Sequence, residues 1–254
     1  MAETGEPKVA PAGVRAALAE HIAEDLETLA LLHDREPAGP MIEELRLLPV
    51  AEWFGLRLSK SEAPAVIDRA LALMPVPVDD ATLDELAADY ADIYLVDSLH
   101  ASPSESLWLE NERLICQQSM FDMRDWYAHY GYEAENWRRR ADDHLVLQLR
   151  FMARLAALAT PDSTIDLARF LDRHTLRWIH TFAERVAARC ATPWFAGVAM
   201  LTADYLETLR GWLEEAAGID RERHPTSVEL AEMRRVEPDE PVREAYVPGV
   251  APGW

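Results

Sequence analysis

Histidines and carboxylates are the side chains with which this sequence could bind a metal or move a proton. A helical di-iron site needs Glu-x-x-His pairs, because that spacing turns a carboxylate and an imidazole inward one turn apart. None of the eight histidines has a glutamate three positions before it. Asp97-x-x-His100 comes nearest, but it occurs once, where a helix is expected to end. A capping or surface pair therefore explains it better than a metal site.

Asp79, Asp80 and Asp84 superficially resemble the aspartates with which terpene synthases bind magnesium. Their spacing differs from that motif, and acids at the start of a helix are also favoured by the helix dipole. A helical metal-dependent enzyme built on them is the alternative interpretation. The glycine-rich turns of hydrolases, dinucleotide-binding proteins and phosphate loops are missing from the sequence. We therefore expect neither catalysis nor a cofactor.

Composition and charge favour a globular cytoplasmic protein. The 254 residues are 49% hydrophobic and 28% charged, and the formal net charge is −20. Such a field repels nucleic acid and anionic lipid and attracts cationic partners. No apolar run approaches the ~20 residues of a membrane span, and Met1 to Lys8 lack the pattern of a signal peptide. Cys116 and Cys190 lie far apart in the sequence, so both are expected to be reduced.

Hydrophobic periodicity predicts helices nearly throughout the chain, which makes the fold class all-α. One amphipathic helix is expected from Leu83 to Tyr94, starting with the capping pattern Thr82-x-x-Glu85. A second start, Ser102-Pro103-Ser104-Glu105, places proline at the first helical position and predicts a long helix toward Tyr130.

The segment from Leu145 to Leu158 is apolar on almost every side, which is typical of a helix at the centre of a bundle. Thr192-Pro193 is expected to start a final helix. Between them, one stripe is expected to face the same core; it consists of Leu167, Leu171, His174, Trp178 and Phe182.

The domain organisation follows from these patterns. We expect a flexible N-terminus over residues 1–12, a helical domain over 13–218 and an extended, proline-rich tail over 219–254. Val14 to Leu32 and Ala63 to Met74 read as shorter helices. They could join the same bundle or form a subdomain that ends at a break near residues 75–81.

Three blocks occur in an order that is typical of a known family. They are the aromatic helix end Tyr90, Ile93 and Tyr94, the helix start Pro103-Ser104-Glu105-Ser106-Leu107-Trp108-Leu109, and the step Asp143-His144-Leu145. In this order the chain resembles the TorD/DmsD/NarJ family of cytoplasmic maturation chaperones for molybdenum redox enzymes. It departs from the family pattern at Gln148, where glutamate is common, at Asp97-Ser98, which replaces Gly-Pro, and in the residues preceding Asp143.

The resemblance implies a TorD-like helical bundle that binds a peptide and performs no catalysis. The partner would be the catalytic subunit of a molybdenum enzyme of the dimethyl sulfoxide reductase type, held by its N-terminal twin-arginine or equivalent segment while the cofactor is inserted. Such a segment joins basic and apolar parts, so its receptor needs an apolar trough with an acidic rim. The residues implied are Tyr94, Pro103, Ser106, Trp108, Asp143 and His144.

Structural roles compete with these functional ones. Tyr90 and Leu107 are better explained as core residues, whereas Tyr94 and Trp108, near helix ends, fit the core and the trough equally well. Asp143 is expected to be a helix N-cap, with His144 in the first turn, where the dipole favours a neutral imidazole. A purely structural helical adaptor is a third interpretation, and the chain could be a monomer or a homodimer.

Overall fold

The computed structural model of the chain describes residues 12–110, 118–133 and 140–236. Within these ranges the protein is all-helical, as predicted, and its one extended feature is an isolated antiparallel bridge between Ser104 and His144. The α-helices are α1 (Ala12–Asp34), α2 (Gly39–Leu45), α3 (Ala63–Leu73), α4 (Asp80–Tyr90), α5 (Ser106–Leu109), α6 (Gln118–His129), α7 (Leu145–Leu158), α8 (Pro161–Arg173), α9 (Ile179–Arg189), α10 (Pro193–Ala217) and α11 (Ser227–Val236).

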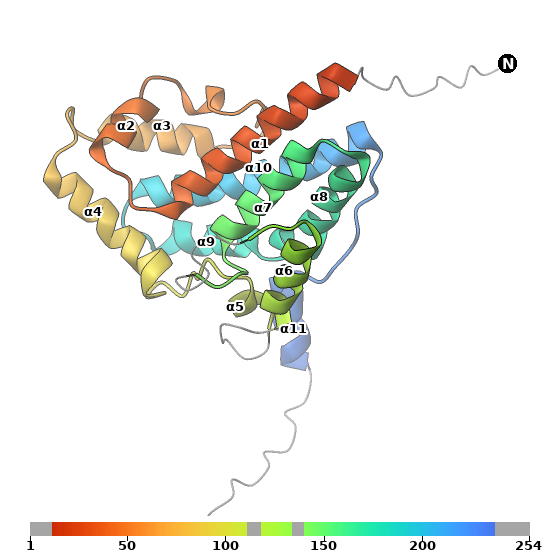
Figure 1. Ribbon diagram of the computed structural model, residues 1–254. Helices are drawn as coiled ribbons and strands as arrows, with labels where there is room; N and C mark the ends of the chain where they lie inside the picture. The colour runs from red at the N-terminus through yellow and green to blue at the C-terminus, as the bar shows by residue number, and fades with distance from the viewer. Residues whose placement is uncertain (1–11, 111–117, 134–139, 237–254) are drawn as a thin grey trace, which may run out of the picture.

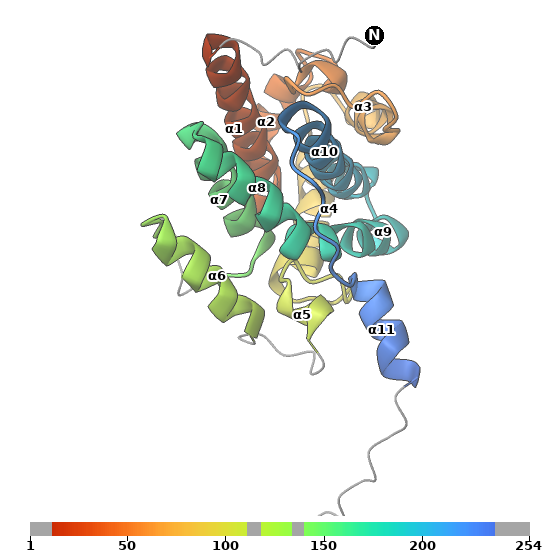
Figure 2. The same ribbon diagram turned by 90° about the vertical axis from the view of Figure 1, so that its right-hand side faces the viewer.

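The helix α7 lies at the centre of the bundle, beside α1 and α8, and α10 lies against α3 and α9 (Figures 1 and 2). Most of the α7 side chains are buried, which explains why its sequence lacks a polar face. The N-terminal helices contribute Leu26, Leu29 and Ile67 to the same continuous hydrophobic core. They are therefore layers of one bundle rather than a separately packed unit.

The helix α4 begins earlier than its capping pattern predicted. Asp79, not Thr82, is the N-cap, and its carboxylate accepts a hydrogen bond from the Thr82 backbone N–H at 2.9 Å. The helix then continues through a π-helical turn, Ala91–Leu95, that carries Tyr94.

The predicted long helix from Ser102 toward Tyr130 is wrong. Pro103 precedes the helix rather than opening it, α5 covers only Ser106–Leu109, and Glu110 has extended backbone angles. A separate helix, α6, follows at Gln118–His129. The capping pattern gave a wrong prediction because the Ser102 hydroxyl accepts from the Ser104 backbone N–H within a turn. The cap of α5 comes instead from a distant residue, Asp143.

The stripe from Leu167 to Phe182 is buried as predicted, but it belongs to two helices. His174 breaks the run with backbone angles far from helical, and a 3₁₀ turn, Thr175–Arg177, leads into α9. Pro193 opens α10 as expected, whereas the Thr192 hydroxyl donates to the Asp89 carboxylate at 2.6 Å instead of capping the helix.

The segment after α10 differs from the extended tail expected for residues 219–254. Asp172 accepts hydrogen bonds from the buried Arg210 and from the backbone N–H of Glu222, at 2.7 to 2.8 Å. The chain then forms α11, and Arg234 donates to the Leu109 carbonyl. The proline-rich composition did not predict this helix, whose start is capped by Thr226 and Glu229 and whose outside partners lie on α5 and α9. Residues 237–254, including Tyr246 and Trp254, lie outside the described ranges.

None of the described helices is long and apolar enough to cross a membrane. Cys190 is a free thiol, and burial raises its pKa to about 11. Cys116 lies outside the described residues.

Candidate functional site

Two of the sequence blocks form one junction, although they are nearly forty residues apart in the chain. The Leu145 backbone N–H donates to the Pro103 carbonyl at 2.7 Å, and the Ser106 backbone N–H donates to Asp143 Oδ2 at 2.8 Å. The bridge between Ser104 and His144 lies between these two bonds. We call the residues from Pro103 to Ser106 and from Asp143 to Leu145 the motif junction.

The roles of Asp143 and His144 in helix capping differ from the prediction. Asp143 caps α5 across the junction, whereas His144 is the N-cap of α7, where its Nδ1 accepts from the Val146 backbone N–H at 3.2 Å. Burial, reinforced by the charge of Arg140, lowers the pKa of His144 to about 3. The imidazole is therefore neutral, as predicted, although burial is the main cause.

The Asp143 carboxyl is completely buried. Burial raises its pKa, and the hydrogen bonds from Ser106 oppose that shift. One oxygen, Oδ1, has no hydrogen-bond partner. An acidic group held this way contributes to the shape of the junction rather than to an acidic rim.

Tyr94 is connected to the interior through His33. The Thr202 hydroxyl donates to the Val198 carbonyl, so it must accept the proton on His33 Nε2, at 2.7 Å. His33 Nδ1 is then an acceptor, and the Tyr94 hydroxyl donates to it at 2.5 Å. Burial lowers the pKa of His33 to about 3, in agreement with this neutral tautomer.

Trp108 belongs to the same series of contacting rings as Tyr94. We call this series the aromatic layer; it consists of Tyr94, His33, Phe182, Trp178 and Trp108. Its indole N–H donates to the Ser102 carbonyl at 2.8 Å, and its ring stacks on Trp178 with centroids 6.3 Å apart. The Arg185 guanidinium lies over the ring, 4.6 Å from its centroid. Trp178 and Phe182 continue the ring contacts to His33, so Tyr94 and Trp108 are joined through the core.

The motif junction is closed in this structure. Asp143 and Ser106 have no exposed surface, and His144 and Trp108 are 6% and 7% exposed. Pro103 is buried as well, and Tyr94 is only partly buried. The structure thus brings Pro103, Ser106, Asp143 and His144 together and leaves Tyr94, among the six predicted residues, with the clearest access to solvent.

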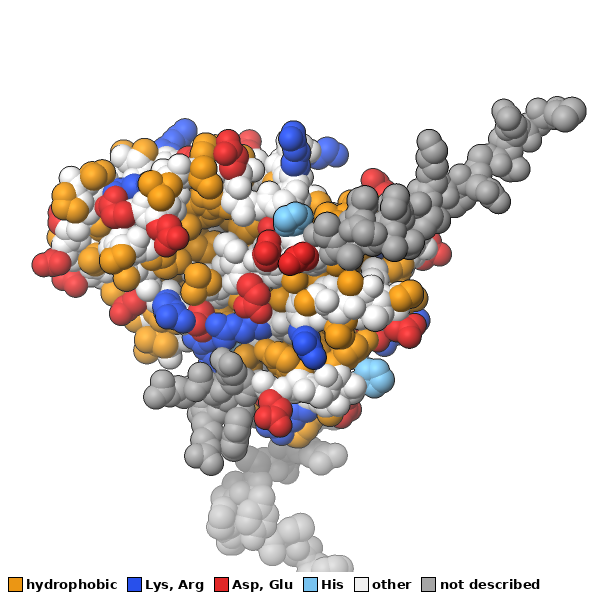
Figure 3. All heavy atoms as spheres, turned by 45° about the horizontal axis from the view of Figure 1, so that its top comes forward, with side chains coloured by type: hydrophobic (Ala, Val, Ile, Leu, Met, Phe, Trp, Pro, Cys, Tyr) orange, Lys and Arg blue, Asp and Glu red, His pale blue; other side chains and the backbone are white. Residues whose placement is uncertain are grey.

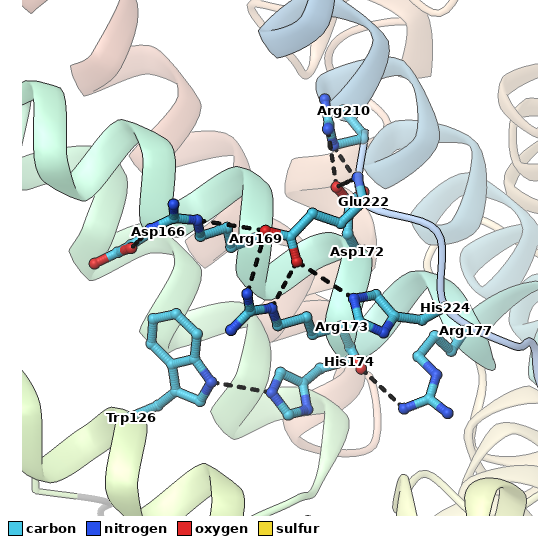
Figure 4. Close-up of polar contacts among 10 residues, drawn as sticks. All are labelled: Trp126, Asp166, Arg169, Asp172, Arg173, His174, Arg177, Arg210, Glu222 and His224. Atoms are coloured by element: carbon cyan, nitrogen blue, oxygen red, sulfur yellow. Dashed lines mark hydrogen bonds and ion pairs between the residues drawn. The ribbon is translucent and has the colours of Figure 1, made fainter. Parts of the chain in front are cut away.

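A buried polar network beneath the junction was missed by the sequence interpretation. Trp126 donates its indole N–H to His174 Nε2 at 3.0 Å, so His174 must donate from Nδ1 to Glu105, at 2.9 Å (Figure 4 shows the Trp126–His174 contact). Gln148 donates to Glu105 at 2.8 Å and accepts from Thr175 at 2.7 Å. The available signal was Gln148, a polar residue in an otherwise apolar helix.

The acidic alternative does not assemble a metal centre. Asp79 accepts from Thr82 as a helix cap, which lowers its pKa. Across the described residues no three His, Cys, Asp or Glu side chains gather to hold a metal ion.

Comparisons with known proteins find similarity to one kind of protein. The sequence model of the nitrate reductase delta subunit family matches residues 61–184. The chaperone protein TorD of Vibrio cholerae is 30% identical over 145 residues, which span 54% of this chain and 65% of that protein. TorD of Shewanella oneidensis is 29% identical over 196 residues, 74% of this chain and 88% of that protein. The chain is therefore TorD-like, as its motifs predicted.

A more distant similarity links the chain to a solved structure of a candidate redox enzyme maturation protein from Archaeoglobus fulgidus. The TM-score is 0.44 and the identity 17%, over 77% of this chain and 95% of that one. A similarity of this size does not define the fold, which is described above from the chain itself.

Proposed function

We propose that this protein is a cytoplasmic maturation chaperone that binds the N-terminal segment of a molybdenum-enzyme catalytic subunit before cofactor insertion and export. The observation that carries the proposal is the motif junction. Blocks that the family resemblance singled out, Pro103 to Ser106 and Asp143-His144, are hydrogen-bonded to each other through both backbone and side chain. The relatives named as TorD chaperones support the same conclusion.

The structure supports a binding role rather than a catalytic one. Each of the buried acids and histidines at and beneath the junction makes at least one hydrogen bond within the protein: Asp143 Oδ2 accepts from Ser106, Glu105 accepts from His174, and His144 caps α7. Such groups give a fixed shape to the surface above them. A chaperone needs that fixed shape because it must recognise a segment without changing it chemically.

The six predicted residues take two parts in this proposal. Four of them hold α5 and α7 together at the junction: Pro103, Ser106, Asp143 and His144. The other two, Tyr94 and Trp108, form the two ends of the aromatic layer. The client segment, with the twin-arginine type as the expected one, would bind over this region. Tyr94, which is partly exposed, is the residue of the six best placed to touch it directly.

Capture of leader peptides tests the proposal. The purified chain is mixed with immobilised peptides carrying twin-arginine leaders, and retention is compared for the wild type, Trp108→Ala and His144→Ala. His129→Ala, on the exposed end of α6, is the matched control. Circular dichroism restricts the comparison to folded variants. We expect the wild type and the control to be retained and the two junction variants to be lost.

Two other outcomes have distinct meanings. If no leader retains the wild type, the proposed function is wrong. If folded Trp108→Ala and His144→Ala are retained as strongly as the control, the function stands but the six residues are not its site.

A further inference from the structure

A groove runs between α1 and α7, outside the motif junction. It has a volume of about 960 Å³ and is open to solvent. Its floor consists of small side chains, Ala23, Ala153 and Ala157. Ala153 and Ala157 are four residues apart on α7, so they lie on one face of the helix, where their size leaves room between the two helices.

The rim of the groove is acidic. Glu20, Glu24 and Glu27 follow one another at helical spacing along α1, and Glu133 adds a fourth carboxylate from the segment after α6. Acidic side chains are visible along the middle of the face shown in Figure 3. Like charges four residues apart weaken a helix by ~0.2–0.5 kcal/mol per pair, so Glu20 and Glu24 do not stabilise α1 by being together.

Two arginines of α7, Arg150 and Arg154, also line the groove. Arg150 pairs with Asp34 at 3.2 Å and lies 3.8 Å from Glu27, so the four glutamates of the lining face only two guanidinium groups. Burial alone would raise the pKa of Asp34, but the hydrogen bonds and charges of Arg140, Arg35 and Arg150 lower it. The remaining charge of the rim is therefore mainly negative.

The helix α7 leads from the motif junction to the groove. That helix begins at Leu145, directly after His144, and Ala157 lies about 18 Å further along it at 1.5 Å per residue. Arg150 lines the groove and donates to Asp34, and the Asp34 carbonyl accepts from the Tyr90 hydroxyl at 2.7 Å. A single extended peptide could reach from the groove to the aromatic layer.

Charge identifies the occupant that fits. The segment 237–254 of this chain is itself acidic, with Glu237, Asp239, Glu240 and Glu244 against Arg243, and a second copy carries the same net charge of −20. Both would be repelled by the rim. A segment that combines basic side chains with an apolar stretch would match both the carboxylates and the alanine floor.

We propose that the groove between α1 and α7 binds the basic and apolar parts of the client's N-terminal segment, with its basic side chains against Glu20 and Glu24. This inference rests on the proposed function and adds the place and polarity of binding. Arg154 lies on the opposite rim and would repel the basic side chains of the client. This repulsion places them on the α1 side of the groove.

Fluorescence anisotropy with a labelled synthetic peptide tests the inference. The probe carries a pair of arginines followed by an apolar run, and a matched peptide carries glutamines in place of the arginines. The variants are Glu20→Gln/Glu24→Gln, Arg154→Gln and Ala157→Phe, which fills the floor from an exposed position. Glu214→Gln/Glu215→Gln, exposed near the end of α10, is the control with the same change of charge.

The charge variants are expected to act in opposite directions. Glu20→Gln/Glu24→Gln should weaken binding of the arginine peptide about fivefold, and Arg154→Gln should strengthen it about twofold. Both effects should shrink at high salt and vanish with the glutamine peptide. Ala157→Phe should weaken binding of both peptides at any salt concentration, and the control should behave as the wild type.

Three results would overturn the inference. Unchanged affinity in all three groove variants, with normal binding by the wild type, would place the client elsewhere and leave the proposed function intact. A change of oligomeric state in Ala157→Phe, measured by light scattering, would assign the groove to a second copy. Failure of the wild type to bind any leader peptide would reject the proposed function itself.

Discussion

Tyr94 contributes a buried hydrogen bond as well as an aromatic ring. Because its hydroxyl donates to His33 Nδ1, Tyr94→Phe would leave that nitrogen buried without a donor. The expected cost is about 1–3 kcal/mol in the free energy of unfolding, measured by urea denaturation. Tyr130→Phe is the control, since Tyr130 donates to Asp166 at a more accessible position where water can replace it, and it should cost less. Equal losses of unfolding free energy in the two variants would show that the hydrogen bond from Tyr94 to His33 stabilises the fold no more than the one from Tyr130 to Asp166.

The two buried neutral histidines predict a definite dependence of stability on pH. Burial lowers the pKa of both His33 and His144 to about 3, against ~6.5 in an unfolded chain. As pH falls below ~6.5 the unfolded chain takes up protons that the folded chain does not bind. Stability is therefore full above that pH and is lost on acidification, by up to ~1.4 kcal/mol per pH unit for each histidine.

His144→Asn isolates one of these contributions because asparagine can still cap α7. Between pH 6.5 and 5 its unfolding free energy should fall less steeply than that of the wild type. This window lies above that of Glu207, whose pKa is lowered to about 2, chiefly by a hydrogen bond from His180. An unchanged slope in His144→Asn would mean that His144 titrates normally.

Residue types were predictable at the site, but their partners were not. A carboxylate followed by histidine before an apolar run correctly indicated a helix start near residue 144. The sequence could not show that Asp143 caps α5 instead, because that bond joins residues 37 positions apart. Glu105 and His174 are likewise bonded across a separation of 69 positions.

Between elements, α3 approaches α10 closely at Gly197. A Cβ atom there would lie 2.5 Å from Ile67 Cγ1, and the Ile67 side chain is completely buried and stiff. Gly197→Ala should therefore destabilise the fold by about 1–3 kcal/mol, measured by denaturant unfolding.

Gly211 in the same helix provides the opposite expectation. No atom lies within 4 Å of a Cβ added there, so Gly211→Ala should stabilise the protein by up to ~1 kcal/mol through helix propensity alone. If both substitutions had the same sign, helix propensity rather than the contact between α3 and α10 would govern Gly197.

Helices were predictable where their own sequence determines them. The bounds of α7 agree with the expected Leu145 to Leu158, since its apolar residues need no outside partner to define the helix. The helix α5 did not follow its local pattern because the backbone N–H groups at its start, those of Glu105 and Ser106, donate to the distant Asp143. The break at His174 was invisible because a buried stripe continues across it.

The net charge of −20 acts on the molecule as a whole. Self-repulsion of this kind destabilises a compact state, and added salt screens it. NaCl should therefore raise the Tm, and MgCl2 at equal ionic strength should raise it by a similar amount. A saturable additional rise with MgCl2 would instead support the metal-dependent alternative at Asp79, Asp80 and Asp84, because a ligand that binds the folded state stabilises it.

The fold class was predictable from the sequence, but the path of the chain after α10 was not. Periodicity gave an all-α bundle with α7 inside, and that assignment is confirmed. The return of the chain after α10 was not foreseen, because Asp172 and Arg210 hold residues 219–222 through contacts that composition does not encode.

The four-residue helix α5 has a consequence for synthesis on the ribosome. So short a helix is not stable by itself, and the carboxylate that caps it belongs to Asp143. A nascent chain that has emerged only as far as α6 therefore lacks the finished junction. If the client binds over this region, as proposed, binding would begin only after the start of α7 has left the exit tunnel. An unfinished chain would then not compete with finished copies of the protein for the client.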